Sequence, residues 1–494
     1  MRTPGRAART ESPMSSAPSG PLVVGVDSST QSTKALVVDA GTGEVVASGQ
    51  APHTVSSGAL RESDPEQWWD ALCEALRQCG AAAREAAAVS VGGQQHGLVT
   101  LDARGGSVRP ALLWNDVRSA PQARALVERL GGAKAWADRV GSVPGPSFTV
   151  TKWAWLAEHE PASVRATAAV RLPHDYLTQR LTGSGTTDRG DVSGTGWWAS
   201  ATESYDEEIL RLVGLDPALL PRVVHSGEVA GTVRGSNELP FSKGTLVAPG
   251  TGDNAAAALG LGLRPGTPVL SLGTSGTVYA VSERRPTDPT GTVAGFADAR
   301  GAWLPLACTL NCTQAIDRVA ALLSLDREAV QPGGAVTVLP YLDGERTPDL
   351  PHASGTLHGL RHDTTPGQVL QAAYDGAVHA LLGALDAVLD AEADRSEPLL
   401  LIGGGARGTA WQETVRRLSG RPVQIPEARE LVALGAAAQA AGLLSGEDPA
   451  AVARRWGTAR GPVLEAVERD EPTLVRISSL LSDAAPLLDG DHGA

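Results

Sequence analysis

Two short turns rich in glycine, serine and threonine lie in opposite halves of the chain. The first reads DSSTQSTK over residues 27–34, and the second reads SLGTSGT over residues 271–277. Each turn stands between apolar runs, which predicts a β-hairpin with a polar tip. Such tips present backbone N–H groups and hydroxyls to an anion, as phosphoryl transfer requires. One such turn alone is typical of any hairpin, whereas two of them predict a phosphate group held from both sides.

The length and the pattern of the chain predict more than one domain. Its 494 residues are too many for one hydrophobic core. Strand-like runs alternate with helix-length segments, which favours an α/β fold. We expect a disordered tail over residues 1–20, a first domain over 21–263, a second over 264–485 and a tail over 486–494. A cleft between two such domains is a common ligand site.

Charge and cysteine content limit the classes of partner. The net charge is −13 and no dense Lys/Arg block occurs, so nucleic acid and anionic membranes are poor candidates. No apolar run is long enough to predict a transmembrane helix. The four cysteines are too few for a disulfide scaffold, and a reducing cytoplasm is the expected setting. Cys308 and Cys312 have helical spacing but lack further metal ligands nearby, so we interpret them as buried thiols.

Asp253 is the carboxylate with the most suggestive position. It follows the sequence PGTG and precedes a small-residue helix, near the joint between the two halves. One interpretation is a helix cap, which needs no further function. The other is a base that accepts a proton from a substrate hydroxyl during phosphoryl transfer, with Asn254 bonding the same substrate.

Two polar clusters follow predicted strands. Gln94, Gln95 and His96 come after the strand over 88–93, and the sequence WNDVR over 114–118 ends the strand over 111–114. Strand ends commonly carry binding residues in α/β sheets, and converging neutral donors and acceptors suit a polyol. The alternatives are a solvated histidine in the first cluster and, in the second, a packed tryptophan with a helix cap and a surface ion pair.

A triglycine over residues 403–405 follows the strand over 398–402. It lacks the complete P-loop and dinucleotide patterns, so it is either a plain strand-to-helix turn or a place where adenine or ribose approaches the backbone. Lys34 directly follows the first turn. It is either a surface lysine or a cation placed beside phosphate.

Taken in order, these features resemble the FGGY family of carbohydrate kinases over residues 21–485. Two family signatures stand in place: SFTVTKWAWLAEH over 147–159, and GTLHGL over 355–360 followed by QVLQAAYD over 368–375. The resemblance implies two actin/hexokinase-like (ribonuclease H-like) ATPase domains around a central cleft. It also implies phosphorylation of a small sugar by ATP with Mg²⁺.

Further stretches are most similar to family members that phosphorylate D-xylulose, among them GQQHG over 93–97 and YLDGERTP over 341–348. By that resemblance Asp253 is the general base, and Asp27 binds Mg²⁺ directly or through water. The expected sugar ligands are Gln95, His96, Trp114, Asn115, Asp116, Asp253 and Asn254, and the expected ATP ligands are Thr30, Gln31, Ser32, Lys34, Gly273, Thr274, Ser275, Gly404, Gly405 and Ala406.

The sequence departs from the family pattern at two of these places. Ser29 stands where many relatives have glycine, and Gln95 where members that use xylulose often have methionine. Rival hypotheses are a kinase of the same family for ribulose or gluconate, a sugar-responsive repressor and a chaperone-type ATPase. The repressor would need a helix-turn-helix module, and the chaperone a peptide-binding domain. A homodimer stays open.

Overall fold

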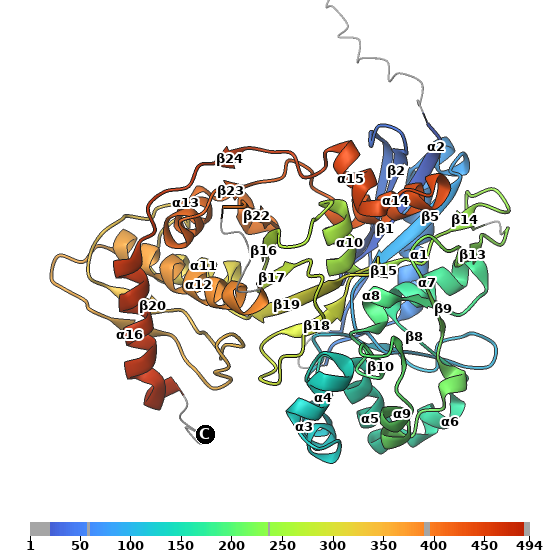
Figure 1. The fold of residues 1–494 in the computed structure, drawn as a ribbon, viewed down its shortest axis with the longest axis horizontal. Coiled ribbons are helices and arrows are strands. Elements are labelled where there is room, and N and C mark those ends of the chain that lie inside the picture. The colour runs from blue at the N-terminus through green and yellow to red at the C-terminus, as the bar shows by residue number, and fades with distance from the viewer. Residues whose placement is uncertain (1–19, 57–59, 236–237, 390–395, 489–494) are drawn as a thin grey trace, which may run out of the picture.

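The computed structural model describes residues 20–56, 60–235, 238–389 and 396–488. Within these residues, two lobes each contain a seven-stranded mixed sheet (Figure 1). Nearly all of the expected N-terminal tail lies outside the described residues. The expected C-terminal tail begins inside helix α16 (Glu471–Leu488), and residues 489–494 lie outside the described residues.

The first sheet is built on the predicted hairpin. Strands β1 (Leu22–Ser28) and β2 (Ser32–Asp39) pair antiparallel, with Asp27 opposite Lys34. β3 (Val45–Pro52) extends the hairpin, and β5 (Ala88–Gly93) lies parallel to β1 on its other side. β14 (Leu246–Val247) follows parallel to β5, and β13 (Gly231–Thr232) closes the row antiparallel. β1 is buried throughout because helices cover both faces of the sheet, which explains its continuous apolar run.

The second sheet repeats the order and directions of the six strands just described. β16 (Pro268–Leu272) and β17 (Gly276–Ala280) form the second predicted hairpin, and β19 (Trp303–Thr309) pairs antiparallel with β17 as β3 does with β2. β22 (Leu399–Ile402) is parallel to β16, β23 (Val423–Gln424) is parallel to β22, and β24 (Val463–Leu464) is antiparallel to β23. β18 (Ala294–Ala297) adds an edge strand beside β19. The duplication predicted from the two turns is therefore present in the topology.

Helices cover the sheets through apolar faces. α1 (Pro65–Gln78) begins with the Asp64 side chain accepting a hydrogen bond from the Glu66 N–H and with Pro65 in the first turn. It buries Trp68 and Leu72 against β2 and β3. In the second lobe, α12 (Pro366–Val388) packs its long apolar face on β17 and β19.

Helix α14 (Leu431–Ser445) belongs to the second half of the sequence but packs on the first sheet, as Figure 1 shows. Ala433 and Ala437 share a core with strand residues of β1 and β2. The Gln439 side chain accepts hydrogen bonds from the Ser90 hydroxyl at 2.6 Å and the Gly250 N–H at 3.0 Å. This helix therefore ties the second half of the chain to the first lobe.

Helix α10 (Asp253–Gly260) crosses α14 at very close range. A Cβ atom at Gly435 would overlap the carbonyl oxygen of Ala256, and one at Gly260 would overlap that of Leu431. Only glycine permits this approach. The crossing fixes the position of α10, whose first residue is Asp253.

Many of the residues between β5 and β14 form the lower part of the first lobe in Figure 1, whereas β13 belongs to the first sheet. The expected strand over 111–114 is shorter, covering β7 (Ala111–Leu112) alone. The PGTG sequence before Asp253 contains a short strand, β15 (Thr251–Gly252), because its backbone pairs parallel with the end of β5. The other elements of this region are β6 (Val99–Leu101), α3 (Ala120–Arg129), α4 (Ala133–Val140), α5 (Thr149–His159), α6 (Pro161–Ala166), β8 (Ala169–Arg171), α7 (Pro173–Thr182), β9 (Thr186–Asp188), α8 (Arg189–Val192), β10 (Trp198–Ala199), β11 (Ser204–Tyr205), α9 (Glu207–Val213), η1 (Pro217–Leu219) and β12 (Arg222–Val224).

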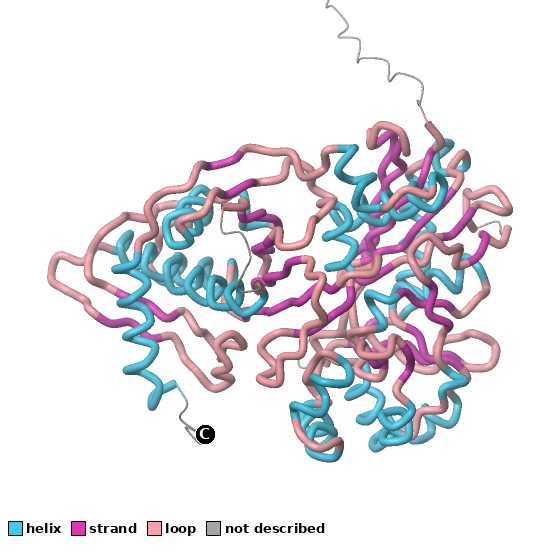
Figure 2. The backbone as a smooth tube through the Cα atoms, in the orientation of Figure 1, coloured by secondary structure: helices cyan, strands magenta, loops and turns pink. Residues whose placement is uncertain are grey.

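The segment between α11 (Thr313–Leu322) and α12 is mostly loop, apart from strands β20 (Thr337–Leu339) and β21 (Thr356–His358) (Figure 2). The remaining elements are β4 (Glu62–Ser63), α2 (Gly80–Arg84), η2 (Gly404–Arg407), α13 (Thr409–Ser419) and α15 (Pro449–Trp456).

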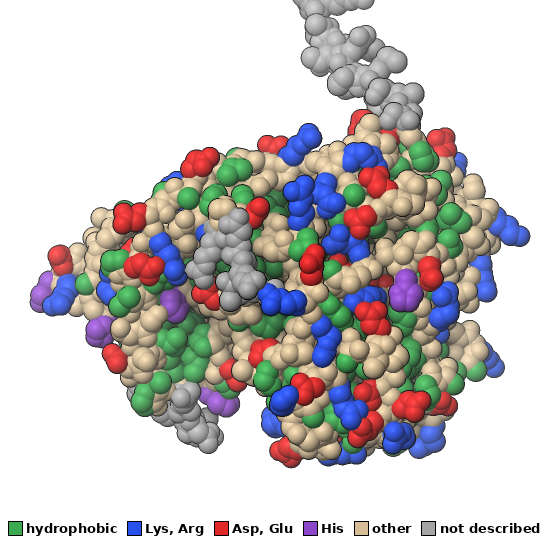
Figure 3. Space-filling model, in the orientation of Figure 1, with side chains coloured by type: hydrophobic (Ala, Val, Ile, Leu, Met, Phe, Trp, Pro, Cys, Tyr) green, Lys and Arg blue, Asp and Glu red, His purple; other side chains and the backbone are tan. Residues whose placement is uncertain are grey.

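Acidic and basic side chains alternate over the face shown in Figure 3. Among the helices of the described residues, none has the length and apolar character needed to cross a membrane.

Candidate active site

A cavity of about 470 Å³ lies between the lobes and takes its lining from both. The first lobe contributes Asp27 and Lys34 from the first hairpin, and residues after β5 and at the start of α10. The second lobe contributes Ser275 from the second hairpin and side chains from β18 and β19. The two polar turns therefore face one cavity, as the sequence predicts.

Asp253 stands at the start of α10, on the floor of this cavity. Gly252 is the N-cap residue, so Asp253 does not take the capping position that the alternative interpretation gave it. Gly252 pairs with Gly93 at the end of β5, which brings Asp253 beside the residues that follow that strand. Burial raises the pKa of Asp253 to about 6. A carboxylate with that pKa is ionised at neutral pH and still basic enough to accept a proton.

Two amide side chains fix the surroundings of Asp253. Asn254 donates through Nδ2 to Oε1 of Gln95 at 2.6 Å and to Oδ1 of Asp253 at 3.1 Å, and its backbone N–H donates to the same Oδ1 at 2.8 Å. Both hydrogen bonds from Asn254 end on Oδ1, so Oδ2 receives neither of them. Gln95, Asp253 and Asn254 thus form one polar group on the cavity wall.

His96 adds a buried aromatic face to this wall. Its backbone has a φ of 62°, and its ring stacks on Phe148 with a centroid distance of 5.6 Å and lies 5.0 Å from Phe296. Burial, together with the positive charges of Lys152 and Arg346, lowers the pKa of His96 to about 3. The imidazole is therefore neutral and serves as a hydrogen-bonding group rather than as a charge.

Asp27 is a second carboxylate at the cavity. Burial, followed by the charge of Asp253, raises the pKa of Asp27 to about 7, against the opposing effect of Lys34. Its Oδ1 atom is buried and has no hydrogen-bond partner among the described residues. A buried, unpaired carboxylate oxygen beside a phosphate-type turn fits Mg²⁺, which binds proteins through one or two carboxylates and takes its other ligands from water and phosphate. The described residues contain no group of three acidic, histidine or cysteine side chains able to hold a metal alone.

Among the other residues of the first turn, Lys34 lines the cavity but forms an ion pair with Glu430 at 2.7 Å. Thr30, Gln31 and Ser32 are not among the residues that line it. Thr30 accepts a hydrogen bond from the indole nitrogen of Trp114 at 3.3 Å, and Trp114 itself lines the cavity.

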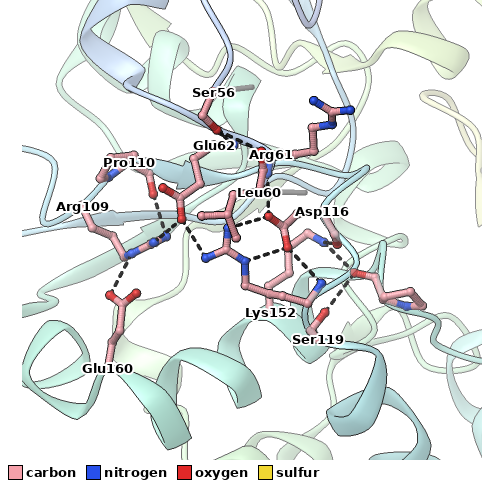
Figure 4. Close-up of polar contacts among 12 residues, drawn as sticks. Ser56, Leu60, Arg61, Glu62, Arg109, Pro110, Asp116, Ser119, Lys152 and Glu160 are labelled. Carbon is pink, nitrogen blue, oxygen red and sulfur yellow. Dashed lines mark hydrogen bonds and ion pairs between the residues drawn. The ribbon is translucent and has the colours of Figure 1, made fainter. Parts of the chain in front are cut away.

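Asp116 does not line the cavity, and its neighbour Asn115 does not either. The Asp116 carboxylate accepts hydrogen bonds from the Arg61 N–H at 2.8 Å and from Nε of Arg118 at 2.8 Å (Figure 4). Burial alone would raise the pKa of Asp116, but these donors hold it below its usual range. Asp116 therefore forms the ion pair of the alternative interpretation, although its carboxylate is buried rather than at the surface.

Lys152, from the first family signature, belongs to the same network (Figure 4). It is 1% exposed, and its Nζ donates to the carbonyl oxygens of Pro146 at 2.6 Å and Asp116 at 3.3 Å. Burial lowers the pKa of Lys152 to about 7. Its two hydrogen bonds join the loop that carries Trp114 to the loop that carries Phe148, and both of these aromatic residues line the cavity.

The second hairpin places only part of its predicted set at the cavity. Ser275 lines it, whereas Gly273 and Thr274 do not. Of the triglycine, Gly403 lines the cavity with a φ of 86°, where a Cβ would press on the Leu272 carbonyl. Gly404, Gly405 and Ala406 form the turn η2 directly behind it.

A buried cluster of charged side chains packs against the backbone that leads to Gln95 and Asp253. Nε2 of His174 lies 3.2 Å from Asp175, 3.3 Å from Asp188 and 3.4 Å from Asp191. Burial would lower the pKa of His174, but these carboxylates raise it to about 9. His174 packs on Gly93 and Gly250, the backbone just before Gln95 and Asp253.

Sequence reasoning missed several lining residues, notably Phe296, Tyr279, Arg346 and Arg429. Phe148 and Arg346 lie inside motifs that the sequence displayed, but nothing in a motif says which of its side chains turns toward a cavity. Phe296 and Arg429 carry no local signal, because they reach the site only through strand pairing and the docking of α14.

The fold and the cavity together define a two-lobed sugar kinase, and comparison with known proteins agrees. Residues 22–260 match the N-terminal domain of the FGGY family of carbohydrate kinases, and residues 269–443 match its C-terminal domain. The chain belongs to this family. The expected fold of two actin/hexokinase-like domains is therefore confirmed.

Individual relatives are very similar over nearly their whole length. The Xylulose kinase of Streptomyces coelicolor is 83% identical over 96% of this chain and 99% of its own. The Xylulose kinase of Streptomyces rubiginosus is 82% identical over 97% of this chain and 100% of its own. The crystal structure of the xylulose kinase from Bifidobacterium adolescentis superimposes with a TM-score of 0.81 at 38% identity, covering 93% of this chain and 99% of that one.

Proposed function

We propose that this protein transfers the γ-phosphoryl group of ATP to D-xylulose and produces D-xylulose 5-phosphate and ADP. The observation that carries the proposal is the near full-length identity of 83% to a Xylulose kinase, in a chain whose two polar turns and Asp253 face one cavity. ATP is made and used in the cytoplasm, which we propose as the location.

We assign the proton transfer to Asp253. Oδ2, which Asn254 does not engage, would accept the proton of the terminal sugar hydroxyl as that oxygen attacks the γ-phosphorus. The new bond joins this oxygen to phosphorus, and the bond to the bridging oxygen between the β- and γ-phosphates breaks. The proton stays on Asp253 until product release, and ADP carries the electron pair of the broken bond.

The other lining residues bind and orient the substrates. We propose that Gln95, His96 and Asn254 donate and accept hydrogen bonds with sugar hydroxyls, since all three sit on one wall beside Asp253. Trp114 would cover the sugar from the first lobe. Asp116 would act by holding that loop through Arg61 and Arg118. Asn115, whose buried Oδ1 has no hydrogen-bond partner among the described residues, remains a proposed sugar ligand.

ATP would lie between the two turns. Ser275 and Gly403 are in position to approach its phosphates or ribose, and Lys34 would exchange Glu430 for phosphate oxygen. Thr30, Gln31, Ser32, Gly273, Thr274 and the turn over Gly404, Gly405 and Ala406 remain proposed ligands that need the lobes to close. Mg²⁺, which Asp27 would hold directly or through water, offsets the negative charge of the phosphate oxygens during transfer.

Sugar binding and adenosine binding are assigned to different parts of the chain. We propose that residues 21–263 bind the sugar and that residues 264–485 supply the adenosine site. Helix α14 contacts the first sheet across this division.

A coupled ADP-release assay across D-xylulose, ribulose, gluconate and glycerol tests the substrate. We expect kcat/KM for D-xylulose to exceed the others by at least about tenfold, because the loss of one matched hydroxyl contact costs about that much. A higher kcat/KM for ribulose or gluconate would replace the proposed substrate, and no sugar-dependent ADP release would exclude a kinase.

A further inference from the structure

The edge strand of the second sheet is bound to the first lobe. β18 is the outermost strand of its sheet, so one edge of its backbone faces away from the other strands. On that edge the Gly295 N–H donates to the carbonyl oxygen of Gly141 at 3.0 Å and to the hydroxyl oxygen of Ser142 at 2.9 Å. The Ala297 N–H donates to the hydroxyl oxygen of Ser193 at 2.9 Å. The first lobe therefore satisfies the backbone groups that a further strand would otherwise take.

The same strand forms part of the cavity wall. Ala294 and Phe296 alternate along β18 with the two residues whose N–H groups bind the first lobe, and both line the cavity. The Phe296 ring lies 5.0 Å from the ring of His96 and 6.0 Å from that of Phe148, centroid to centroid. Any movement of β18 relative to the first lobe would therefore change the width of the cavity beside His96.

Arg189, from α8 of the first lobe, reaches into the turn between β18 and β19. Its guanidinium donates to the carbonyl oxygens of Ala302 at 2.5 Å and Asp298 at 3.4 Å, and it lies over the Trp303 ring, 4.5 Å from the centroid. Glu203 accepts a further hydrogen bond from it at 2.6 Å. The Arg189 side chain is 3% exposed, so the loss of these partners would leave a buried charge uncompensated. Arg189 therefore fixes this turn to α8.

Helix α8 also packs against the backbone that carries Asp253. A Cβ atom at Gly190 would lie 2.7 Å from Oγ1 of Thr251 and 3.4 Å from Cβ of Ala255. Thr251 stands two positions before Asp253, and Ala255 stands two positions after it. Because α8 contacts both β15 and β18, this short helix joins the edge strand of the second sheet to the chain on both sides of the proposed base.

We propose that Arg189 is a positioning residue for phosphoryl transfer, which binds β18 to α8 and thereby sets the distance between the second-lobe wall of the cavity and Asp253. The inference deepens the proposed function and rests on it, because it takes Asp253 as the base. A sugar held between Phe296 and His96 would meet Oδ2 of Asp253 only if these walls are correctly spaced, and a misplacement of about 1 Å costs up to about a hundredfold in rate. Arg189 acts through these elements, since it is not among the residues that line the cavity.

The test compares Arg189→Met with Arg189→Lys. Methionine keeps an apolar chain over Trp303 but removes the donors to Ala302 and Asp298. We expect Arg189→Met to lower kcat for D-xylulose phosphorylation about ten- to hundredfold, to raise the KM for the sugar by a smaller factor and to leave the KM for ATP within about twofold. Arg189→Lys should recover part of the loss, because it restores a charged donor without the planar fork of arginine.

Arg285→Met is the matched control, because Arg285 also joins the two lobes but has its partners outside α8. Its guanidinium donates to the Ser200 hydroxyl at 3.1 Å and to the Asp138 carbonyl oxygen at 3.0 Å. We expect Arg285→Met to keep kcat within about twofold of the wild type. An equal loss of kcat in Arg285→Met and Arg189→Met would show that any weakened contact between the lobes has this effect, and it would overturn the proposal.

A second pair of variants tests the same link without touching Arg189. Ser193, the C-cap residue of α8, accepts the Ala297 hydrogen bond, so Ser193→Ala should lower kcat about three- to tenfold. Ser142→Ala is its control, because the Gly295 N–H keeps the Gly141 carbonyl oxygen, and it should match the wild type. Normal kcat in Ser193→Ala would contradict the role given to α8.

Thermal unfolding separates positioning from stability. We expect Arg189→Met to have a lower Tm, so the kinetics of every variant are measured well below the lowest unfolding temperature. A normal kcat in the folded Arg189→Met protein would mean that Arg189 serves stability alone, and an equal rise in the KM for ATP would mean a general disturbance of the cleft; either result overturns the proposal. If Arg189→Met does not fold, Arg189→Lys and Ser193→Ala decide by the same criteria.

The two proposals fail in different ways. If the wild-type protein phosphorylates another sugar, the proposed substrate is wrong, and the same variants are then assayed with that sugar. If the wild type uses D-xylulose but Arg189→Met keeps a normal kcat, only the inference on Arg189 is wrong.

Discussion

Nδ2 of Asn254 lies 2.6 Å from Oε1 of Gln95, across 159 positions of sequence. The contact joins the turn after β5 to the start of α10. It holds Asn254 where its amide and backbone N–H both reach Asp253. Because the two amides act as a unit, we expect Gln95→Ala and Asn254→Ala each to raise the KM for the sugar about tenfold.

A double-mutant cycle checks this coupling. The double variant should be less impaired than the product of the two single effects, by about three- to tenfold, because neighbouring side chains in one hydrogen-bond network couple. Strictly multiplicative effects would show that the two amides act independently.

The pH dependence of kcat/KM reports on the two cavity carboxylates. Asp253 must be ionised to accept a proton, and its pKa is raised to about 6. Activity should therefore rise with pH through about 6 and fall by about tenfold per unit below it. The measurement is kcat/KM for D-xylulose between pH 4.5 and pH 8, because its pH dependence reports the pKa values of the free enzyme.

Asp27, whose pKa is raised to about 7, contributes to the same acidic limb of the pH profile of kcat/KM. The apparent pKa values read from this profile belong to the pair of carboxylates rather than to either one. An acidic limb below about pH 4.5 would mean that neither raised pKa governs catalysis.

Lys152 supports the site through its two carbonyl contacts. Lys152→Met removes the ammonium group that donates to the carbonyls of Pro146 and Asp116, and the Pro146 carbonyl keeps only the Ser119 hydroxyl at 3.1 Å and the Thr151 hydroxyl at 3.4 Å as donors. We expect the free energy of unfolding to fall by about 2 kcal/mol and the sugar KM to rise. Urea denaturation measures the first and steady-state kinetics the second.

Lys134→Met is the matched control, because Lys134 forms an exposed pair with Asp138. It should change stability by less than about 0.5 kcal/mol. A similar loss in both variants would indicate that lysine removal as such is harmful.

The crossing of α10 and α14 offers a test of what positions Asp253. Gly435→Ala would press a methyl group on the Ala256 carbonyl, so the helices must separate. We expect about 1–3 kcal/mol of destabilisation together with a lower kcat. The control is Gly383→Ala in α12, where a Cβ meets nothing within 4 Å, and this change should stabilise the protein by about 0.5–1 kcal/mol. A tolerated Gly435→Ala would show that the crossing is not needed for the site.

Local patterns predicted the elements of this fold well. Both hairpins and the strand before the triglycine follow from apolar runs and turn residues. The packing of α14 on the first sheet had no such signal, because its apolar face is compatible with either lobe. Long-range docking depends on shape, here on glycines at 260 and 435, and not on periodicity.

Local sequence patterns also predict only part of the candidate site. Asp27, Lys34, Gln95, His96, Trp114, Asp253, Asn254 and Ser275 line the cavity as predicted. Asp116 has the residue type of a sugar ligand, and the sequence left an ion pair open as the alternative. Local spacing could not decide between the two, because the Arg61 N–H that also binds the carboxylate comes from 55 positions away. Arg346 and Arg429 lie in turns and bends outside regular helices and strands, where sequence gives no direction for a side chain. The roles of all these residues stay predictions.

Asp253→Asn tests the central claim most directly, with the exposed Asp70→Asn as control. The amide keeps the size of the side chain and its hydrogen bond with Asn254, but it cannot accept a proton. We expect kcat for D-xylulose phosphorylation to fall by about 10²- to 10⁴-fold, with ATP binding by calorimetry within about twofold of the wild type and Asp70→Asn fully active. An Asp253→Asn protein with near-normal turnover would contradict the assignment of the base.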